Sequence, residues 1–246
     1  MPRYDFRTPR LFLDGPVGEG AALALSREQG NYLGNVLRLK EGDAVLVFNG
    51  RDGEWRAELA EAGRRTTALT VGAQVRPQEG GPDIDYLFAP LKRARLDYMV
   101  EKATEMGVAR LRPVLTRRTV AERVNVERMR AHAIEAAEQC GILRLPEVRA
   151  PEKLERAIAG WEAARPIVFC DEDSAESCPF TALARIPPGP VAVLIGPEGG
   201  FDPSERELLS SQPFVTRISL GPRILRADTA AVAALALVNA VLGDWR

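Results

Sequence analysis

Two glycine-marked loops contain the residues of this chain that are best suited to holding a ligand. Residues 195–201 read Ile-Gly-Pro-Glu-Gly-Gly-Phe and residues 220–226 read Leu-Gly-Pro-Arg-Ile-Leu-Arg. Each loop follows a β-branched run and precedes a predicted helix. Because glycine lacks a Cβ, the backbone N–H and C=O groups of such loops can approach a ligand closely. We expect the two loops to follow adjacent strands and to form one pocket built largely from main chain.

The first loop differs from the familiar glycine-rich phosphate loops. No Lys-Ser or Lys-Thr pair follows its glycines, and its G-x-x-G-G spacing is not that of the dinucleotide-binding fingerprint. A helix start follows, with Asp202 as N-cap, Pro203 at the first helical position and Glu205 three residues after the cap. A single turn of this kind is usually only a tight turn. Its pairing with the second loop favours a ligand site, with the Glu198 carboxylate at the edge.

The second loop combines aliphatic and cationic side chains. Ile224 and Leu225 are suited to sandwiching a flat heteroaromatic ring, while Arg223 and Arg226 are suited to meeting phosphate or an exocyclic oxygen. The alternative is purely structural, with Asp228 or Thr229 as a helix cap and Arg226 in a surface ion pair. The two roles are compatible.

Composition excludes several classes of protein. The chain has 246 residues, of which 46% are apolar and 27% are charged, as in ordinary soluble proteins. No window holds the roughly 18 apolar residues of a membrane span, and the first residues lack a secretion signal, so we expect a cytoplasmic protein. Three cysteines without metal-ligand spacing predict no metal site. The single histidine, His132, nearly excludes a histidine-based triad and predicts a helix-face role instead.

Positive charge is concentrated in the middle of the chain. The formal net charge is −1, yet residues 92–130 contain eleven Lys/Arg against five Asp/Glu. Such an excess is typical of a surface for an anionic partner. It is equally typical of a solvated helix face whose balancing acids lie elsewhere, and charge alone leaves both interpretations open.

Short strands and turns dominate the first part of the chain. A predicted helix over residues 26–37 has Ser26 as N-cap and Gln29 as its capping-box partner. Many short strands at this spacing predict a small barrel. The predicted strands cover residues 10–13, 22–25, 44–48, 54–60 and 66–71.

Strands and helices alternate after a Pro/Gly-rich boundary at residues 77–82, which predicts a parallel, helix-covered sheet and an α/β class. Ligands of such sheets bind beyond the carboxyl ends of the strands, where both loops lie. The last helix is apolar nearly all round, so we expect a homodimer, although burial within one chain is the alternative. Predicted strands cover residues 84–89, 111–115, 166–170, 191–195 and 217–220, and predicted helices cover 95–106, 126–140, 203–210 and 229–242.

Several motifs in order resemble the bacterial small-subunit ribosomal RNA uridine-N3 methyltransferase family, within the SPOUT superfamily of knotted methyltransferases. The resemblance covers nearly the whole chain. Besides the two loops, its markers are residues 32–39 (YLGNVLRL), 92–108 (KRARLDYMVEKATEMGV) and 135–140 (EAAEQC). It implies a PUA-like RNA-binding β-barrel over residues 1–75 and a SPOUT methyltransferase domain with a trefoil knot over residues 76–246. It also implies a homodimer.

The family further implies S-adenosyl-L-methionine as cofactor, held by the two loops. The matching cofactor-binding positions are Ile195, Gly196, Pro197, Glu198, Gly199, Leu220, Gly221, Ile224, Leu225 and Thr229.

The activity expected from the resemblance is methylation of N3 of a uridine in 16S ribosomal RNA within the 30S subunit. Arg226 would stabilise negative charge on the uracil carbonyl oxygens, and Glu198 or Asp228 would accept the N3 proton. Alternatives are a SPOUT enzyme acting on another base or on ribose 2′-OH, and a non-catalytic RNA-binding protein. The expected RNA contacts are Arg3, Arg10, Arg38, Lys92, Arg95, Lys102, Arg118 and Arg144.

Overall fold

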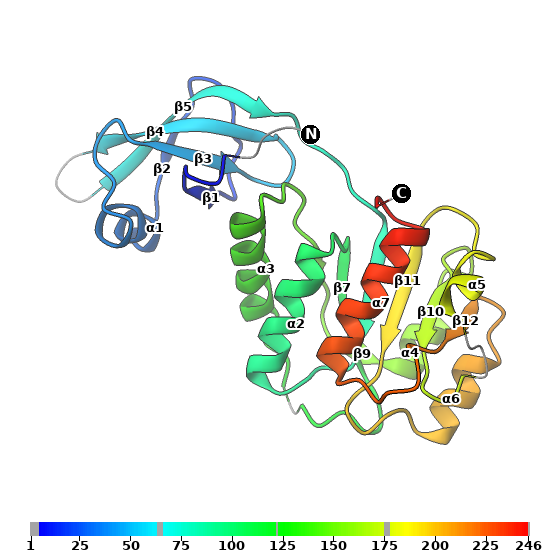
Figure 1. Cartoon of the computed structure of the whole chain (residues 1–246). Helices are drawn as coiled ribbons and strands as arrows, with labels where there is room; N and C mark the ends of the chain where they lie inside the picture. The colour runs from blue at the N-terminus through cyan, green and yellow to red at the C-terminus, as the bar shows by residue number, and fades with distance from the viewer. Residues whose placement is uncertain (1–4, 63–65, 122, 175–177, 246) are drawn as a thin grey trace. The chain divides into compact units, whose positions relative to one another are not determined.

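The computed structural model describes residues 5–62, 66–121, 123–174 and 178–245. Contacts divide the chain into two compact units. The first comprises Met1–Gly80 together with Ala137–Arg144, and the second comprises Gly81–Ala136 and Leu145–Arg246. Figure 1 shows the elements of each unit. None of the helices in the described ranges is long and apolar enough to cross a membrane.

The first unit contains a five-stranded, mainly antiparallel sheet with the spatial order β1-β3-β4-β5-β2. Its strands are β1 (Arg10–Phe12), β2 (Ala22–Ala24), β3 (Ala44–Phe48), β4 (Glu54–Ala62) and β5 (Thr66–Arg76). On β4, Ala57 and Leu59 are buried in its core while Arg56 and Glu58 are exposed, as expected for a strand with one covered face. Within the described residues β1 and β2 are the two edges, so the sheet is a curled half-barrel rather than a closed barrel.

The helical connection in this unit begins as its sequence predicts and then departs from α-helical geometry. Ser26 Oγ accepts a hydrogen bond from Gln29 N at 3.1 Å, and Gln29 Oε1 accepts one from Ser26 N at 3.0 Å, which confirms the capping box. The α-helix α1 (Arg27–Asn31) continues as the π-helical turn η1 (Tyr32–Val36). Arg38 then adopts a φ of +59°, in the left-handed region that favours glycine.

The second unit is built on a parallel sheet with the spatial order β12-β10-β11-β6-β7-β8, and β9 also pairs with β7. In chain order its elements are β6 (Ile84–Phe88), α2 (Arg93–Glu105), β7 (Arg110–Leu115), α3 (Val126–Cys140), β8 (Glu147–Val148), β9 (Glu152–Lys153), α4 (Leu154–Ala159), β10 (Ile167–Cys170), α5 (Pro179–Leu183), β11 (Val191–Ile195), α6 (Pro203–Ser210), β12 (Val215–Ile218) and α7 (Ala227–Val241).

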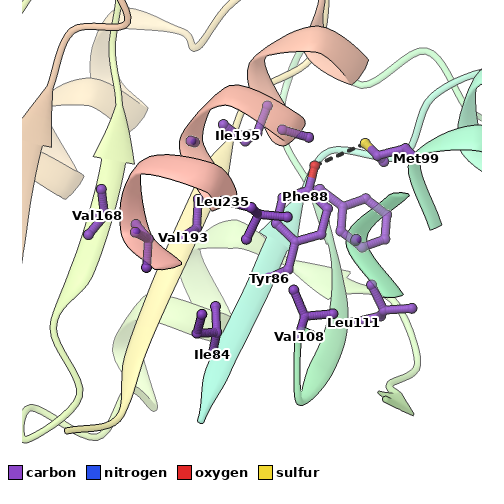
Figure 2. Packing of buried hydrophobic residues seen from close by; sticks show 14 of the residues in the cluster. Ile84, Tyr86, Phe88, Met99, Val108, Leu111, Val168, Val193, Ile195 and Leu235 are labelled. Carbon is purple, nitrogen blue, oxygen red and sulfur yellow. Dashed lines mark hydrogen bonds between the residues drawn. The ribbon is translucent and has the colours of Figure 1, made fainter. Parts of the chain in front are cut away.

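Helices cover both faces of this sheet because its strands are apolar on both sides. Tyr86 and Phe88 of β6 join the core under α2, α5 and α7, whereas Leu87 joins the core under α4 and α6. Helix α7, red in Figure 1, packs beside α2. Figure 2 shows the first of these cores, in which the buried Tyr86 hydroxyl donates to Met99 Sδ at 3.0 Å.

Some predicted elements differ from the structure. The last predicted strand, residues 217–220, is shifted, because β12 (Val215–Ile218) is set by its pairing with β10 from Ile167 to Cys170. The predicted helix over residues 26–37 is α-helical only as far as Asn31; Gly30 and Gly34 weaken the α-helical preference there. The short elements β8, β9, α4 and α5 were not predicted, since segments of two to six residues carry little periodicity.

Glu54 on β4 is the centre of a buried ion cluster in the first unit. Its Oε1 accepts from Arg10 Nε at 2.6 Å and its Oε2 from Arg76 Nε at 2.7 Å. Both guanidinium groups also donate to carbonyl oxygens of residues 137–142: Arg10 to Ala137 and Arg76 to Gly141. Burial alone would raise the pKa of Glu54, but the hydrogen bonds and charges of Arg76 and Arg10 outweigh it and lower that pKa.

Glu54→Gln should destabilise the first unit by about 3 kcal/mol, because the substitution leaves two buried guanidinium groups without their counter-charge. The folded-state pKa of Glu54 is lowered, so its contribution is present above the ordinary carboxyl pKa of about 4 and is lost as the pH falls through the folded value. The free-energy difference between wild type and Glu54→Gln, measured by denaturant unfolding, should therefore shrink at acid pH. Glu58→Gln, at an exposed position of the same strand, is the control and should change little. Equal effects of the two substitutions would contradict this account.

Candidate functional site

A pocket of about 280 Å³ lies where β10, β11 and β12 end, at the carboxyl edge of the parallel sheet. Both glycine loops line it, as the sequence predicts. Its volume is near the lower end of the range for small-molecule sites. The lining residues are Cys170, Asp171, Glu172, Ile195, Gly196, Pro197, Glu198, Gly199, Gly200, Phe201, Leu220, Gly221, Arg223, Ile224, Leu225, Ala227 and Ala230.

The expectation that the two loops follow adjacent strands is wrong. Strand β10 lies between β11 and β12, so the end of β10 forms the part of the pocket between the loops. Parallel strands joined by helical crossovers need not be neighbours in space, which is why proximity in sequence misled. The sequence analysis therefore did not predict Cys170, Asp171 and Glu172 as pocket residues. The acidic run at residues 171–173, directly after a buried strand, was a signal that could have identified this part of the pocket.

Acidic residues at the end of β10 are already bound to arginine side chains. The Asp171 side chain is fully buried, and its Oδ2 accepts from Arg217 Nη2 at 2.6 Å. Glu172 Oε1 accepts from Arg206 Nη2 at 2.5 Å. Burial raises the pKa of the neighbouring Cys170 thiol far above its ordinary value, so this side chain is a neutral part of the wall.

The first loop owes its shape to one close packing contact and one turn. A Cβ on Gly196 would lie 2.5 Å from the Phe201 ring, so only glycine fits there. Phe201 in turn packs edge-on against Phe169 of β10, with ring centroids 5.0 Å apart. Gly200 N donates to Pro197 O at 2.9 Å, and Gly200 has a φ of +67°. This turn directs Glu198 and the backbone of Gly199 toward the pocket rim.

Helix α6 begins after this loop with the predicted cap. Glu205 of this cap also binds the segment that follows β7. Asp202 Oδ1 accepts from Ser204 N at 3.0 Å, while the buried Glu205 accepts from Asp202 N at 2.9 Å and from Arg117 N at 2.8 Å. Arg118, from the same segment after β7, donates from Nη1 to Gly199 O at 2.8 Å. Residues 117–118 and the first loop therefore support each other.

Glu198 lies at the rim with its side chain 39% exposed. Its Oε1 is 3.3 Å from Arg95 Nη1 of α2. Two residues expected to contact RNA, Arg95 and Arg118, are thus bound to the first loop.

The second loop forms the opposite side of the pocket. Gly221 has a φ of +101°, and Ile224 is 97% exposed, the most exposed large apolar side chain of the described residues. Neither Asp228 nor Thr229 caps α7, which begins at Ala227 with Arg226 in the N-cap position and no side-chain cap bond. Arg226, Asp228 and Thr229 do not line the pocket, although their neighbours Leu225, Ala227 and Ala230 do.

Asp228 and the buried Tyr86 interact electrostatically. Burial first, and then the nearby Cys170 and Asp228, raise the pKa of Tyr86, so its hydroxyl remains a hydrogen-bond donor. Asp228 Oδ1 accepts from Thr229 N at 2.9 Å.

The remaining residues expected to contact RNA differ in availability. Arg3 lies outside the described residues. Arg10 is buried in the ion cluster around Glu54, so its guanidinium group is engaged within the first unit rather than displayed on the surface. Arg38 and Lys92 are exposed, and Arg144 is half-buried. Lys102 Nζ is 2.6 Å from Glu105 Oε1.

Part of the positive excess over residues 92–130 is neutralised by acids from outside that segment. Arg110 Nη1 lies 2.6 Å from Asp83 Oδ1 and 2.5 Å from Asp85 Oδ1. Arg112 Nη1 lies 3.1 Å from Asp85 Oδ2. The arginines of β7 are therefore structural, and the surface excess is limited to fewer residues.

His132 lies on the face of α3 that meets α2. Its Nδ1 is 2.7 Å from Glu101 Oε1, and its Nε2 is 3.3 Å from Asp97 Oδ1. The hydrogen bond from Arg128 is the first cause that lowers the pKa of Asp97. These contacts agree with the helix-face role expected for this histidine.

Gly196→Ala should destabilise the second unit by about 1–3 kcal/mol, because the added methyl group overlaps the buried Phe201 ring. Thermal unfolding should show a lower midpoint for this variant. Gly199→Ala is the matched control in the same loop: its Cβ would lie 3.6 Å from Arg118, an ordinary contact, so its midpoint should stay close to wild type. A Gly196→Ala variant as stable as Gly199→Ala would contradict the packing argument.

Comparison with known proteins connects this pocket to a family. Residues 79–239 match an RNA methyltransferase domain, and residues 25–71 match an RNA methyltransferase PUA domain. A putative methyltransferase from Legionella pneumophila, solved in complex with bound SAM, is similar to the chain with a TM-score of 0.85 and 29% identity, covering 97% of this chain and 99% of that one.

Two relatives have the same name, ribosomal RNA small subunit methyltransferase E. The protein from Rickettsia conorii is 29% identical over 236 residues, which is 94% of each chain. The protein from Synechocystis is 33% identical over 229 residues, covering 90% of this chain and 74% of that one. These matches confirm the family resemblance drawn from the motifs. With a PUA-type sheet followed by a parallel-sheet methyltransferase domain, the chain belongs to the ribosomal RNA small subunit methyltransferase E family.

Proposed function

We propose that this chain transfers a methyl group from S-adenosylmethionine to N3 of a uridine in 16S ribosomal RNA. The observation that carries the proposal is the pocket at the carboxyl edge of the sheet, with both glycine loops on its walls. The relative solved with SAM shares the fold over nearly the whole chain. The names of the relatives support 16S RNA, in the 30S subunit, as the substrate.

The pocket suits a nucleoside with a flat ring and polar edges. Ile195, Leu220 and Leu225 offer apolar contacts to a flat ring, and the turn from Pro197 to Gly200 offers main-chain groups. The carboxylates of Glu172 and Glu198 also line the pocket, and Arg206 and Arg95 respectively pair with them. S-adenosylmethionine supplies an electrophilic methyl group on sulfur. The cofactor positions proposed within the pocket are therefore Ile195, Gly196, Pro197, Glu198, Gly199, Leu220, Gly221, Ile224 and Leu225, with Thr229 beside it.

The chain itself has to align the uracil and remove the N3 proton. Arg226 follows the pocket-lining Leu225, and its guanidinium group has no recorded side-chain partner in the described residues, so it is available for the uracil carbonyl oxygens. Glu198 lies on the pocket rim, and Asp228 lies in the first turn of α7. One of these two carboxylates is the proposed acceptor of the proton. N3 lies on the pairing edge of uracil, so the target uridine must be unpaired.

Helix α7 supports the proposal of a homodimer. Its face with Ala233, Ala236, Leu237 and Ala240 lines an apolar hollow together with Trp245, which is 56% exposed. An apolar face of this kind is suited to cover by a second copy of the chain. A trefoil knot in residues 76–246, an RNA-binding role for residues 1–75 and a cytoplasmic location complete the proposal.

The purified protein, incubated with S-adenosylmethionine and 30S subunits that lack the modification, should produce 3-methyluridine in 16S RNA. Nucleoside mass spectrometry measures the product, and methylation at another atom or in another RNA would contradict the proposal. Arg226→Ala should lower kcat by about 10²–10³-fold while cofactor binding, measured by calorimetry, persists.

Two conservative variants identify the base. Whichever of Glu198→Gln and Asp228→Asn removes the base should lower kcat about 10²–10⁴-fold, and the other should not. Full activity in both variants would show that neither carboxylate accepts the proton.

Charge reversal of Arg38 should weaken RNA binding and leave cofactor affinity unchanged. Arg38 is exposed, lies two residues after the end of the π-helical turn η1, and adopts a φ of +59°, a strained conformation of the kind found at functional positions. The measurement compares the KM for 30S subunits with calorimetric cofactor binding for Arg38→Glu. Parallel loss of both would contradict this division of roles. Arg27→Glu, an exposed arginine at the start of α1, is the control.

A further inference from the structure

A large groove in the second unit lies beside the cofactor pocket. Its volume is about 1360 Å³, and it runs between the start of α2 and the segment that leads from β7 into α3. One wall includes Lys92, Arg93 and Leu96, and the other includes Val120 and Arg123.

The groove displays cations that no acid of the described residues neutralises. Lys92, Arg93 and Arg123 are exposed, and no ion pair to them is recorded in the described part of the chain. Arg128 also lines the groove, but Asp97 holds it through contacts of 2.9 and 2.7 Å, so this pair adds no net charge. Exposed Glu127 is the remaining acid of the described lining, which leaves the groove with a net positive charge.

Apolar side chains accompany these cations. Val120 is 58% exposed, and the half-buried Val124 also lies among the lining residues, whereas Leu91 is buried beneath them. Alternating charge and apolar surface suits a strand that presents both phosphates and unstacked bases. A duplex presents its backbone and keeps its bases stacked, so it would leave the apolar side chains uncovered.

The segments that form the groove also contact the rim of the cofactor pocket. Strands β6, β7 and β11 are parallel, so the segments that follow them emerge at the same edge of the sheet. Arg95, one helical turn after Lys92, reaches Glu198 at 3.3 Å. Arg118, two residues before Val120, reaches Gly199 O at 2.8 Å. Each of the two segments that form the groove therefore has one arginine, next to the lining residues, that contacts the first glycine loop.

We infer that this groove binds the unpaired RNA strand that flanks the target nucleotide, with Lys92, Arg93 and Arg123 on its phosphates and Val120 against a base. The inference rests on the proposed function and adds to it. Arg93, Val120 and Arg123 become RNA contacts, while Arg95 and Arg118 act through the first loop as positioning residues. A strand lying in the groove leads directly to Glu198 and the pocket.

The test compares Arg93→Glu/Arg123→Glu with the matched control Lys153→Glu/Arg156→Glu. Both variants change the net charge by the same amount. Lys153, at the N-cap of α4, and Arg156, within α4, are exposed cations that do not line the groove. Binding of a short oligouridylate is measured at several salt concentrations, together with the KM for unmodified 30S subunits and calorimetric binding of S-adenosylmethionine.

The groove variant should raise the KM for 30S subunits about tenfold or more. The slope of log affinity for oligouridylate against log salt concentration should become shallower by the equivalent of about one to two phosphate contacts. The control should match wild type, and cofactor affinity should be the same in all three proteins. Val120→Ser should weaken oligouridylate binding without altering its salt dependence.

Equal behaviour of the groove variant and the control would overturn the inference. A loss seen with 30S subunits but not with oligouridylate would also overturn it, because the groove would then contact a ribosomal protein. Failure of the proposed function is a separate result, since wild type itself would then produce no 3-methyluridine.

Discussion

The parallel pairing of β6, β11, β10 and β12 is the constraint on which the second unit depends. It brings the ends of strands that are far apart in sequence to one edge of the sheet, where loops replace hydrogen-bonded backbone. Strands β6 and β11 are buried along their whole length, so the first loop starts from a rigid position. The contact between Gly196 and Phe201 extends this order into the first loop, because the ring occupies the space that a side chain would need. A pocket formed largely by main chain needs closely packed strand ends and loop residues beneath it, because the backbone must stay in one position to contact a ligand.

Arginine has two distinct roles in this protein. Arg110, Arg112 and Arg217 neutralise buried or half-buried carboxylates at the sheet, and Arg118 binds the carbonyl oxygen of Gly199. Removing such a guanidinium group would leave a buried charge or carbonyl without its partner. Other cations, such as Arg38 and Lys92, are exposed and available for an anionic partner. In the positive segment, residues 92–130, some cations are therefore balanced by acids from elsewhere in the chain, and others are exposed and available for an anionic partner.

The first unit also contains both kinds of arginine, one that is structural and one that is exposed. Arg10 and Arg38 are both arginines of one small sheet domain, and the sequence analysis assigned both to RNA. The structure buries Arg10 between Glu54 and the carbonyl groups of residues 137–142, where it stabilises the unit, whereas Arg38 is exposed in a strained conformation after a π-helical turn. A guanidinium group that already has an ionic partner and several carbonyl acceptors has few donors left for phosphate.

The sequence by itself determined the two types of sheet, the glycine loops, the capping boxes at Ser26 and Asp202, and the family. These features depend on local patterns: apolar periodicity, cap residues and motif spacing. It did not determine that β10 lies between β11 and β12, that Asp171 and Glu172 border the pocket, or that Arg118 binds the first loop. Those facts depend on which strands become neighbours and on which acid each long side chain reaches. Tertiary packing decides both, because residues distant in the chain compete for the same partners.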